Sequence, residues 1–374
     1  MSYEYLLELH FSQCEIFLKK NLTNSYSDND KTDYQNNLFE LFKKIKDNIP
    51  AVLDEINIFE IQEHLNFITK SLEFLMDSTL NTIPFEVVSC LNLALKDWIN
   101  EEEFIITTSL NNDIDSYSFD DTLAVNDFVY NSINAAYKIS FKKRLIEINL
   151  PSILAKDYFS SVILYHELGH FIDIYYHISE KISLELIENP IKWTTVQNFL
   201  PFVGNKASLE KTKYHVGEYF CDLFAAQYIG TTATNYLSYL EIKTAHKLKF
   251  THPSTENRTV VVNDFLEKKA NPMVELINTY TQTLAEGRKL ERRHDTLNED
   301  DFYNFLPLII NDPKQLHGVF PYAWKIWMGG TEKFKKNANL QIDMKPQAIY
   351  KALNNLIEKT IGNYVIQQDW EKVK

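Results

Sequence analysis

Apolar residues recur at helical spacing over most of the chain, and this pattern limits the fold more than any other sequence feature. Such runs extend from Tyr3 to Leu18 and from Leu38 to Ile45, and the pattern resumes from about residue 260 to Val365. Apolar side chains three or four positions apart give a helix one face to bury. In contrast, Arg144–Leu150 alternates apolar and polar residues before Pro151, which is typical of a half-buried strand. We therefore expect a mainly α protein with a small β-sheet, of the α+β class.

One polar stretch offers the clearest candidate for a domain boundary. Residues Thr107 to Thr122 are rich in Asn, Asp and Ser, a composition that favours a loop. The chain then divides into a helical N-terminal region of residues 1–120, a central core of residues 121–270, and a helical C-terminal region of residues 271–374 packed on that core.

Charge and cysteine content exclude several classes of protein. The chain has 51 acidic and 38 basic residues, a net charge of −13, and no dense basic run. A surface that binds nucleic acid needs clustered Lys and Arg, so we expect no nucleic-acid partner. The three cysteines lie far apart, the N-terminus does not resemble a signal peptide, and no stretch reaches the roughly 18 apolar residues that cross a bilayer. These features predict a soluble cytoplasmic protein without integral membrane association.

The motif with the most chemical content is His166-Glu167-Leu168-Gly169-His170, an HExxH sequence in an apolar helical segment. Histidines four positions apart share one face of a helix, so both imidazoles can bind one zinc ion. Glu167, next to the first histidine, then points at the open position of the metal. The motif predicts His166 and His170 as zinc ligands and Glu167 as general base.

A catalytic zinc ion of this kind needs a third protein ligand, and Glu218 is the candidate. It lies in the apolar helical segment Gly217–Ile229, where a bare carboxylate is unfavourable unless it is paired or bound to a metal. Asp222, one turn later, can orient a ligand histidine through its outer nitrogen. Asp173 is an alternative for that orienting role. A solvated polar edge of the helix is the alternative explanation for the Glu218 and Asp222 pair.

A third segment, Thr251–Arg258, contains a His-Pro pair and ends in arginine. With the HExxH motif and with Glu218-x-x-x-Asp222 followed by Phe-Ala-Ala, it resembles the glutamate-zincin peptidases of the HtpX and CAAX prenyl endopeptidase type, over roughly residues 145–265. The resemblance implies a zincin-like peptidase core, with zinc held by His166, His170 and Glu218. It also implies that Glu167 is the base, that Asp222 lies behind the ligands, and that His252 and Arg258 lie close to the active site.

The chain departs from those families because it has no transmembrane segment, which argues against a membrane-embedded or prenylated substrate. A weaker resemblance is to the ImmA and IrrE regulatory peptidases, which also carry an HELGH sequence and a downstream Glu followed by Phe-Ala-Ala. That resemblance implies action on a repressor or another partner protein.

These observations together predict a zinc metallopeptidase that hydrolyses peptide bonds of a protein or peptide substrate through a zinc-activated water. His252 is the expected donor to the oxyanion, with Tyr214, His215 and Tyr219 in reserve. The strand Arg144–Leu150 is a candidate for pairing with an extended substrate. The alternative is a non-catalytic protein in which zinc braces the fold. In either case the helical flanks offer surfaces for a regulatory partner.

The remaining candidates have plainer interpretations. His177 is expected at the surface or at a helix end, and Cys221 is expected to pack rather than bind metal. Arg258 has the alternative role of tying a loop to a helix. The aromatic segment Phe320–Gly330 is expected to form a buried helix ending at Gly329.

Overall fold

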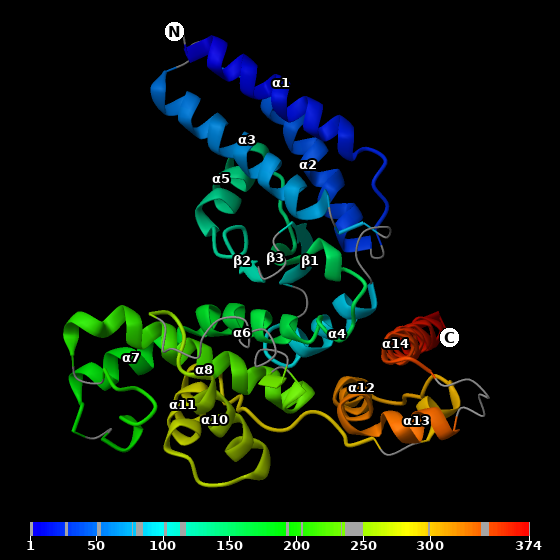
Figure 1. The fold of residues 1–374 in the computed structure, drawn as a ribbon. Coiled ribbons are helices and arrows are strands. Elements are labelled where there is room, and N and C mark those ends of the chain that lie inside the picture. The colour runs from blue at the N-terminus through cyan, green and yellow to red at the C-terminus, as the bar shows by residue number, and fades with distance from the viewer. Residues whose placement is uncertain are drawn as a thin grey trace. The chain divides into compact units, whose positions relative to one another are not determined.

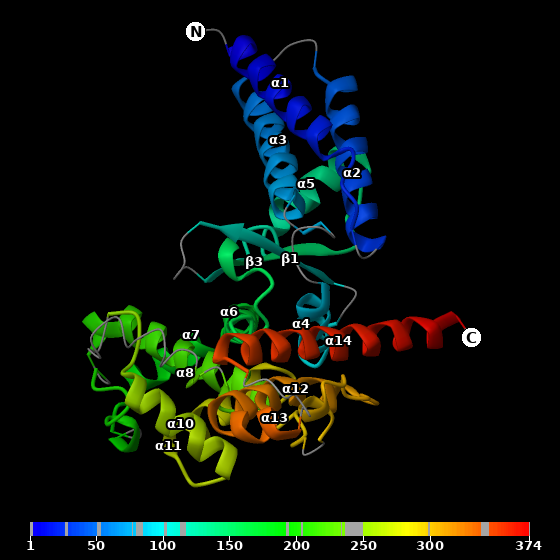
Figure 2. The ribbon, with the colours of Figure 1, turned by 45° about the vertical axis from the view of Figure 1, so that its right-hand side comes forward.

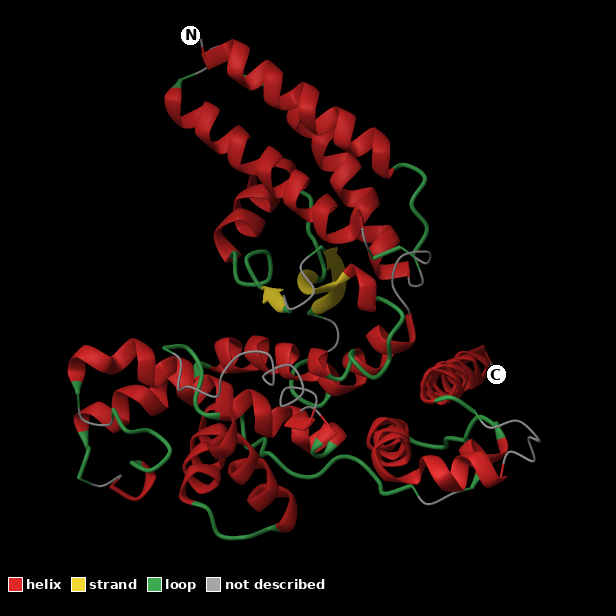
Figure 3. Cartoon of the chain, viewed as in Figure 1, coloured by secondary structure: helices red, strands yellow, loops and turns green. Residues whose placement is uncertain are grey.

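The computed structural model is mainly helical with one small three-stranded sheet, as the sequence predicts (Figure 3). Its elements divide into two compact units: Met1–Val88 with Ile99–Lys156, and Ser89–Trp98 with Asp157–Lys374. The structure describes residues 3–26, 29–50, 54–76, 78–79, 85–100, 103–112, 117–191, 194–202, 205–232, 234–235, 250–297, 300–337 and 344–373. Within these residues, none of the helices is long and apolar enough to cross a membrane.

The first unit combines long helices with the sheet. Its helices are α1 (Tyr3–Asn21), α2 (Asn29–Asp47), α3 (Glu55–Met76) and α5 (Asp127–Tyr137). Both α1 and α2 pack on α3 (Figure 1), and their apolar faces meet in one core that includes Leu38, Leu41, Leu65, Ile68 and Leu72. The helical spacing of these residues in the sequence therefore reflects a shared buried face.

The sheet of the first unit has the order β1-β3-β2. Strand β1 (Phe104–Asn111) is parallel to β3 (Arg144–Pro151) along its whole length, and β2 (Ser118–Asp120) is antiparallel to β3 from Glu147 to Asn149. The strand expected at Arg144–Leu150 is thus confirmed. However, β3 is the central strand, with β1 along one edge and β2 against Glu147–Asn149 on the other, so it is not the edge strand that the suggested pairing with a substrate requires.

The polar stretch Thr107–Thr122 is also not a linker. Its first residues, to Asn111, complete β1, and Ser118–Asp120 forms β2. The division between the units instead lies at Lys156, within the region that the sequence analysis treated as one core. Polar side chains did not prevent strand formation because the backbone pairs with β3 regardless of the side chains.

The second unit is helical in its described residues. Its α-helices are α4 (Phe85–Lys96, of which the part from Ser89 belongs here), α6 (Ile163–Tyr176), α7 (Ile178–Glu188), α8 (Leu209–Ile229), α10 (Thr255–Glu267), α11 (Pro272–Leu284), α12 (Pro313–Lys325), α13 (Thr331–Asn337) and α14 (Pro346–Val373). Short 3₁₀ turns lie at Thr194–Val196, Lys206–Ser208 and Asp301–Asn304, and another, Ser152–Leu154, lies in the first unit.

Helix α8 is the centre of the second unit. It packs against α6, α7, α10 and α12, and every residue from His215 to Ile229 is buried. A helix surrounded by other helices needs an apolar surface on all sides, which explains why this segment lacks an amphipathic pattern. The few polar residues on α8 must therefore find their partners inside the protein.

The aromatic segment Phe320–Gly330 is only partly buried, and its helix does not stop at Gly329. Helix α12 passes into a π-helical turn, Ile326–Gly330, and α13 follows directly. Phe320 and Ile326 are buried, as expected, whereas Met328 is 69% exposed. Trp327 contacts Tyr350 of α14, which packs along α12 (Figure 2).

Buried His317 on α12 makes the second unit sensitive to acid. Its Nδ1 atom is hydrogen-bonded to the hydroxyl of Tyr165 at 2.8 Å, and burial lowers the pKa of His317 to about 3. The unfolded chain takes up a proton at this residue below about pH 6.5, whereas the folded chain does not. The free energy of unfolding therefore decreases as the pH falls below about 6.5. At pH 5 the contribution of His317 is about 2 kcal/mol lower than it is above pH 6.5.

We predict that His317→Gln loses less stability than wild type between pH 7.5 and pH 5, as measured by urea unfolding at each pH. Glutamine keeps a hydrogen-bonding group beside Tyr165 but does not titrate. The exposed His177, changed to Gln, is the matched control and should follow wild type. An equal loss of stability in wild type and His317→Gln would contradict the prediction.

Candidate metal centre

The candidate centre lies where α6 and α8 approach closely, at a glycine of α6. A Cβ atom added to Gly169 would lie 3.0 Å from the Cα atom of Cys221 on α8. Gly169, the fourth residue of the HExxH motif, therefore allows the two backbones to come together. This approach brings His166 and His170 of α6 next to Glu218 and Asp222 of α8.

The carboxylate of Glu218 faces both imidazoles. Its Oε2 atom lies 3.4 Å from Nε2 of His166, and its Oε1 atom lies 3.6 Å from Nε2 of His170. His166 and Glu218 are buried, whereas His170 is partly exposed. The three side chains predicted as metal ligands thus converge from two helices separated by 47 residues of sequence between His170 and Glu218.

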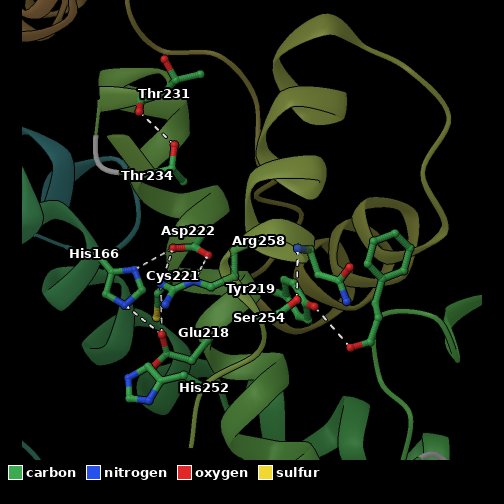
Figure 4. Close-up of polar contacts among 12 residues, drawn as sticks. His166, Glu218, Tyr219, Cys221, Asp222, Thr231, Thr234, His252, Ser254 and Arg258 are labelled. Carbon is green, nitrogen blue, oxygen red and sulfur yellow. Dashed lines mark hydrogen bonds and ion pairs between the residues drawn. The ribbon is translucent and has the colours of Figure 1, made fainter. Parts of the chain in front are cut away.

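Behind these side chains, Asp222 and Arg258 form a buried ion pair. Arg258 donates from Nε to Oδ2 and from its NH2 group to Oδ1 of Asp222, both at 2.7 Å. Oδ1 of Asp222 also lies 3.1 Å from Nδ1 of His166, and the Arg258 NH2 group lies 3.2 Å from Oε2 of Glu218 (Figure 4). One guanidinium therefore holds both carboxylates of α8 in place.

The first turn of α10 fixes the position of Arg258. Ser254 caps this helix by accepting a hydrogen bond from the backbone N–H of Asn257, and Arg258 follows one residue later. Arg258 thus connects α10 and the loop before it to α8. The connection is made through Asp222, which lies directly behind the candidate ligands.

Cys221 adds a fourth group that the sequence analysis assigned to packing. Its Sγ atom lies 3.2 Å from Nδ1 of His170. The ring nitrogens of His166 and His170 and the thiol of Cys221 lie close enough together that these three residues can hold a metal ion. The possible metal donors of this cluster are therefore two imidazoles, a carboxylate and a thiol.

The carboxylate of Glu218 lies close to both imidazoles. Its Oε2 atom lies 3.4 Å from Nε2 of His166 and its Oε1 atom lies 3.6 Å from Nε2 of His170. Two ligand atoms bound to one zinc ion at about 2.1 Å lie about 3.4 Å apart, so the carboxylate is near enough to share an ion with either imidazole. Oε2 of Glu218 is buried and accepts no hydrogen bond of good geometry from the described residues, although Arg258 and His166 lie 3.2 and 3.4 Å away. A metal ion would give this oxygen a partner at bonding distance.

Burial and charge shift the three candidate ligands in different directions: they favour the metal-binding form of Glu218 and His170 and the protonated form of His166. Burial by itself would raise the pKa of Glu218, but the Arg258 guanidinium and His166 hold it well below its ordinary value. Burial lowers the pKa of His170 to about 4, so this imidazole is neutral at pH 7 with a free lone pair. For His166, the Asp222 and Glu218 carboxylates outweigh burial and raise the pKa to about 10.

Glu167 differs from the other carboxylates of the cluster. It is 8% exposed, and burial raises its pKa to about 7, with Glu218 adding to the rise and His166 opposing it. By contrast, the pKa of Asp222 is lowered, because Arg258 and His166 outweigh the effect of burial. Two neighbouring carboxylates are thus ionised at pH 7 while Glu167 is balanced between its two protonation states.

Of the candidate oxyanion donors, His252 is the one that faces the cluster. Its Nε2 atom lies 3.6 Å from Oε1 of Glu218, and its side chain is 45% exposed. The reserve candidates are engaged elsewhere: the Tyr214 hydroxyl donates to Glu210, and the Tyr219 hydroxyl donates to the backbone carbonyl of Phe199. His215 is fully buried, with its ring against Phe202.

The structure also distinguishes between Asp222 and Asp173, the two candidates for the carboxylate that contacts the outer nitrogen of a candidate ligand histidine. Asp173 is buried and accepts hydrogen bonds from the backbone N–H and the hydroxyl of Ser179, at 2.7 and 2.6 Å. It therefore joins the end of α6 to the start of α7, while Asp222 contacts the ligand histidine. His177 lies at the junction of these helices, is largely exposed, and contacts Glu180, as expected for a surface histidine.

Two features of the cluster were missed from the sequence. The contact between Cys221 and His170 depends on the rotation of α8 about its axis, which spacing alone does not fix. The close approach at Gly169 had a visible signal, because a glycine inside a long apolar helix often marks a tight contact.

Comparison with known proteins does not extend this description: no family model, no curated protein and no solved structure matches the chain. The resemblance to zincin peptidases therefore depends on the motifs, and the site itself must carry the functional argument.

Replacing Gly169 with Ala should separate α6 from α8. The added Cβ would press against backbone of Cys221 at 3.0 Å, which no side-chain rotation relieves. Overpacking of this kind destabilises by about 1–3 kcal/mol, whereas alanine gains only about 1 kcal/mol over glycine in a helix. We expect a lower melting temperature and weaker zinc binding, measured by calorimetry and metal titration.

Gly329 provides the matched control, because nothing lies within 4 Å of a Cβ atom added there. Gly329→Ala should leave both quantities unchanged or slightly raise stability. If Gly169→Ala behaves like Gly329→Ala, the close approach does not determine the site.

Proposed function

We propose that this protein is a zinc-dependent endopeptidase in which His166, His170 and Glu218 hold the metal and Glu167 is the general base. The observation that carries the proposal is the convergence of the buried Glu218 carboxylate on the Nε2 atoms of both histidines of the HExxH motif, at 3.4 Å from His166 and 3.6 Å from His170. The order of the three sequence motifs supports the same reaction class.

Zinc, when bound, would lower the pKa of a water molecule to about 7 and polarise the carbonyl of a peptide bond. The protein must then take a proton from the attacking water and deliver it to the leaving amine. Glu167 suits both steps, because a pKa of about 7 lets it accept a proton and release it at neutral pH.

The other polar residues support this chemistry by fixing geometry. Asp222 faces the outer nitrogen of His166 and so favours the ring orientation that presents Nε2. Arg258 holds Asp222 with two hydrogen bonds and contacts Glu218, which limits the motion of both carboxylates. His252, half-exposed beside Glu218, is positioned to donate a hydrogen bond to the carbonyl oxygen of the substrate as negative charge develops there.

A second function has one observation in its favour. If Cys221 joins the two histidines and Glu218, the metal has four protein ligands and no position for water, which is typical of structural zinc. The protein would then be a zinc-braced scaffold whose helices bind a partner. A buried Glu167 with a raised pKa has no role in such a site, so we favour the peptidase.

The decisive comparison is between Glu167→Gln and wild type. We expect Glu167→Gln to bind one equivalent of zinc and to fold normally but to lose at least about 100-fold in cleavage rate, because the general base is absent. Cleavage is measured with unfolded casein and with a quenched peptide library, and zinc by atomic absorption. Wild-type activity should disappear with a chelator and return with zinc.

Two further variants complete the test. Glu218→Ala should lose zinc as well as activity, and Glu188→Gln, at an exposed position on α7, should keep both. Cleavage by Glu167→Gln at the wild-type rate would refute the assignment of the base. A wild-type protein with firmly bound zinc and no cleavage of any substrate would favour the scaffold.

A further inference from the structure

The two candidate ligand histidines have different partners at their outer nitrogens. Nδ1 of His166 lies 3.1 Å from Oδ1 of Asp222, whereas Nδ1 of His170 lies 3.2 Å from Sγ of Cys221. Asp222 and Cys221 are adjacent in the sequence, so one turn of α8 serves both rings. A carboxylate stands behind one imidazole and a thiol behind the other.

The position of Glu218 indicates which nitrogen of each imidazole faces the candidate metal position. Its carboxylate lies on the Nε2 side of both imidazoles. A neutral imidazole that binds metal through Nε2 keeps its proton on Nδ1, and that N–H group needs an acceptor when it is buried. For His170, Sγ of Cys221 is the acceptor at hydrogen-bond distance.

We infer that Cys221 is a positioning residue, which accepts a hydrogen bond from Nδ1–H of His170 and so directs Nε2 toward the metal, and that its sulfur does not bind the metal. The inference rests on the proposed zinc site but not on the proposed peptidase activity. It assigns to the thiol, for His170, the role that Asp222 has for His166.

Geometry and charge both favour this role over metal ligation. An ion bound to Sγ and to Nδ1 of His170 would sit on the edge of the ring opposite to Glu218. The carboxylate of Glu218, which lies on the Nε2 side of both imidazoles, would then not reach the ion. The thiol also has little freedom to move, because Gly169 packs against the backbone of Cys221 and the residue is fully buried.

A thiol in this position has a chemical consequence. Sulfur is a weak and uncharged acceptor, so it orients the ring of His170 without making it as basic as a carboxylate would. The cluster already contains the carboxylates of Glu167, Glu218 and Asp222 near one arginine. Buried Asp173 also acts on His170 and Cys221, so a carboxylate in place of the thiol would add one more buried negative charge to this group.

The test measures zinc affinity and the metal's ligands, and activity is not needed. In wild type, X-ray absorption of the zinc-loaded protein should show nitrogen and oxygen ligands and no sulfur at about 2.3 Å. Cys221→Ala should weaken zinc binding about tenfold in competition with a chromophoric chelator, a loss typical of removing an outer partner of a ligand histidine. Cys221→Ser, which keeps an acceptor, should stay within about threefold of wild type.

Cys14→Ala, which removes a buried thiol in the other unit, is the matched control and should bind zinc as wild type does. A sulfur shell in the wild-type spectrum, or unchanged affinity in Cys221→Ala, would overturn the inference, as would a failure of wild type to bind zinc. If Cys221→Ala does not fold, the wild-type spectrum and the serine variant still decide. Suppose that the zinc measurements follow these expectations but Glu167→Gln still cleaves at the wild-type rate. The proposed peptidase mechanism would then be rejected, and the inference about Cys221 would stand.

Discussion

The contact between α6 and α8 at Gly169 is the constraint on which the rest of the site depends. Because the α6 backbone meets the backbone of Cys221 there, side chains within one turn of Gly169 and Cys221 face each other across a narrow interface. The histidines of one helix and the acids of the other then meet without any long loop between them. Position in this site is set by helices, which hold side chains more rigidly than loops do.

Such packing gathers several ionisable groups in a space where water cannot screen them. Three carboxylates and two imidazoles share this interior with Arg258, and the arginine reaches Asp222 and Glu218 together. Their pKa values separate as a result, with Glu218 and Asp222 held low and Glu167 raised. Groups of one chemical type thus acquire different protonation states from their surroundings, which is common at reactive centres and less common at purely structural ones.

Sequence patterns predicted much of the fold and most of the polar cluster. Helical periodicity and the alternation at Arg144–Leu150 reflect burial on one side of an element, and such burial leaves a local signal in the chain. The residues of the three motifs do meet, since His166, Glu218, His252 and Arg258 are all within one group of contacts. That prediction worked because buried charged residues in apolar segments have few ways to be accommodated.

The features that could not be predicted from the sequence depend on contacts between segments that are far apart in the chain. The strands at Thr107–Asn111 and Ser118–Asp120 are stabilised by backbone pairing with β3, which polar side chains conceal. The place of β3 in the middle of its sheet is a matter of topology, and the neighbour of His170 is decided by how α8 is rotated. None of these properties is contained in a local window of residues.

The arginine behind the site also has a consequence for how the protein matures. Arg258 comes 92 positions after His166 in the chain, and it contacts both Asp222 and Glu218. During synthesis, which adds about 5–20 residues per second, helices α6 and α8 emerge seconds before this arginine. The ion pairs behind the candidate ligands are therefore complete only after α10 has left the ribosome and docked, so this cluster is finished late in folding.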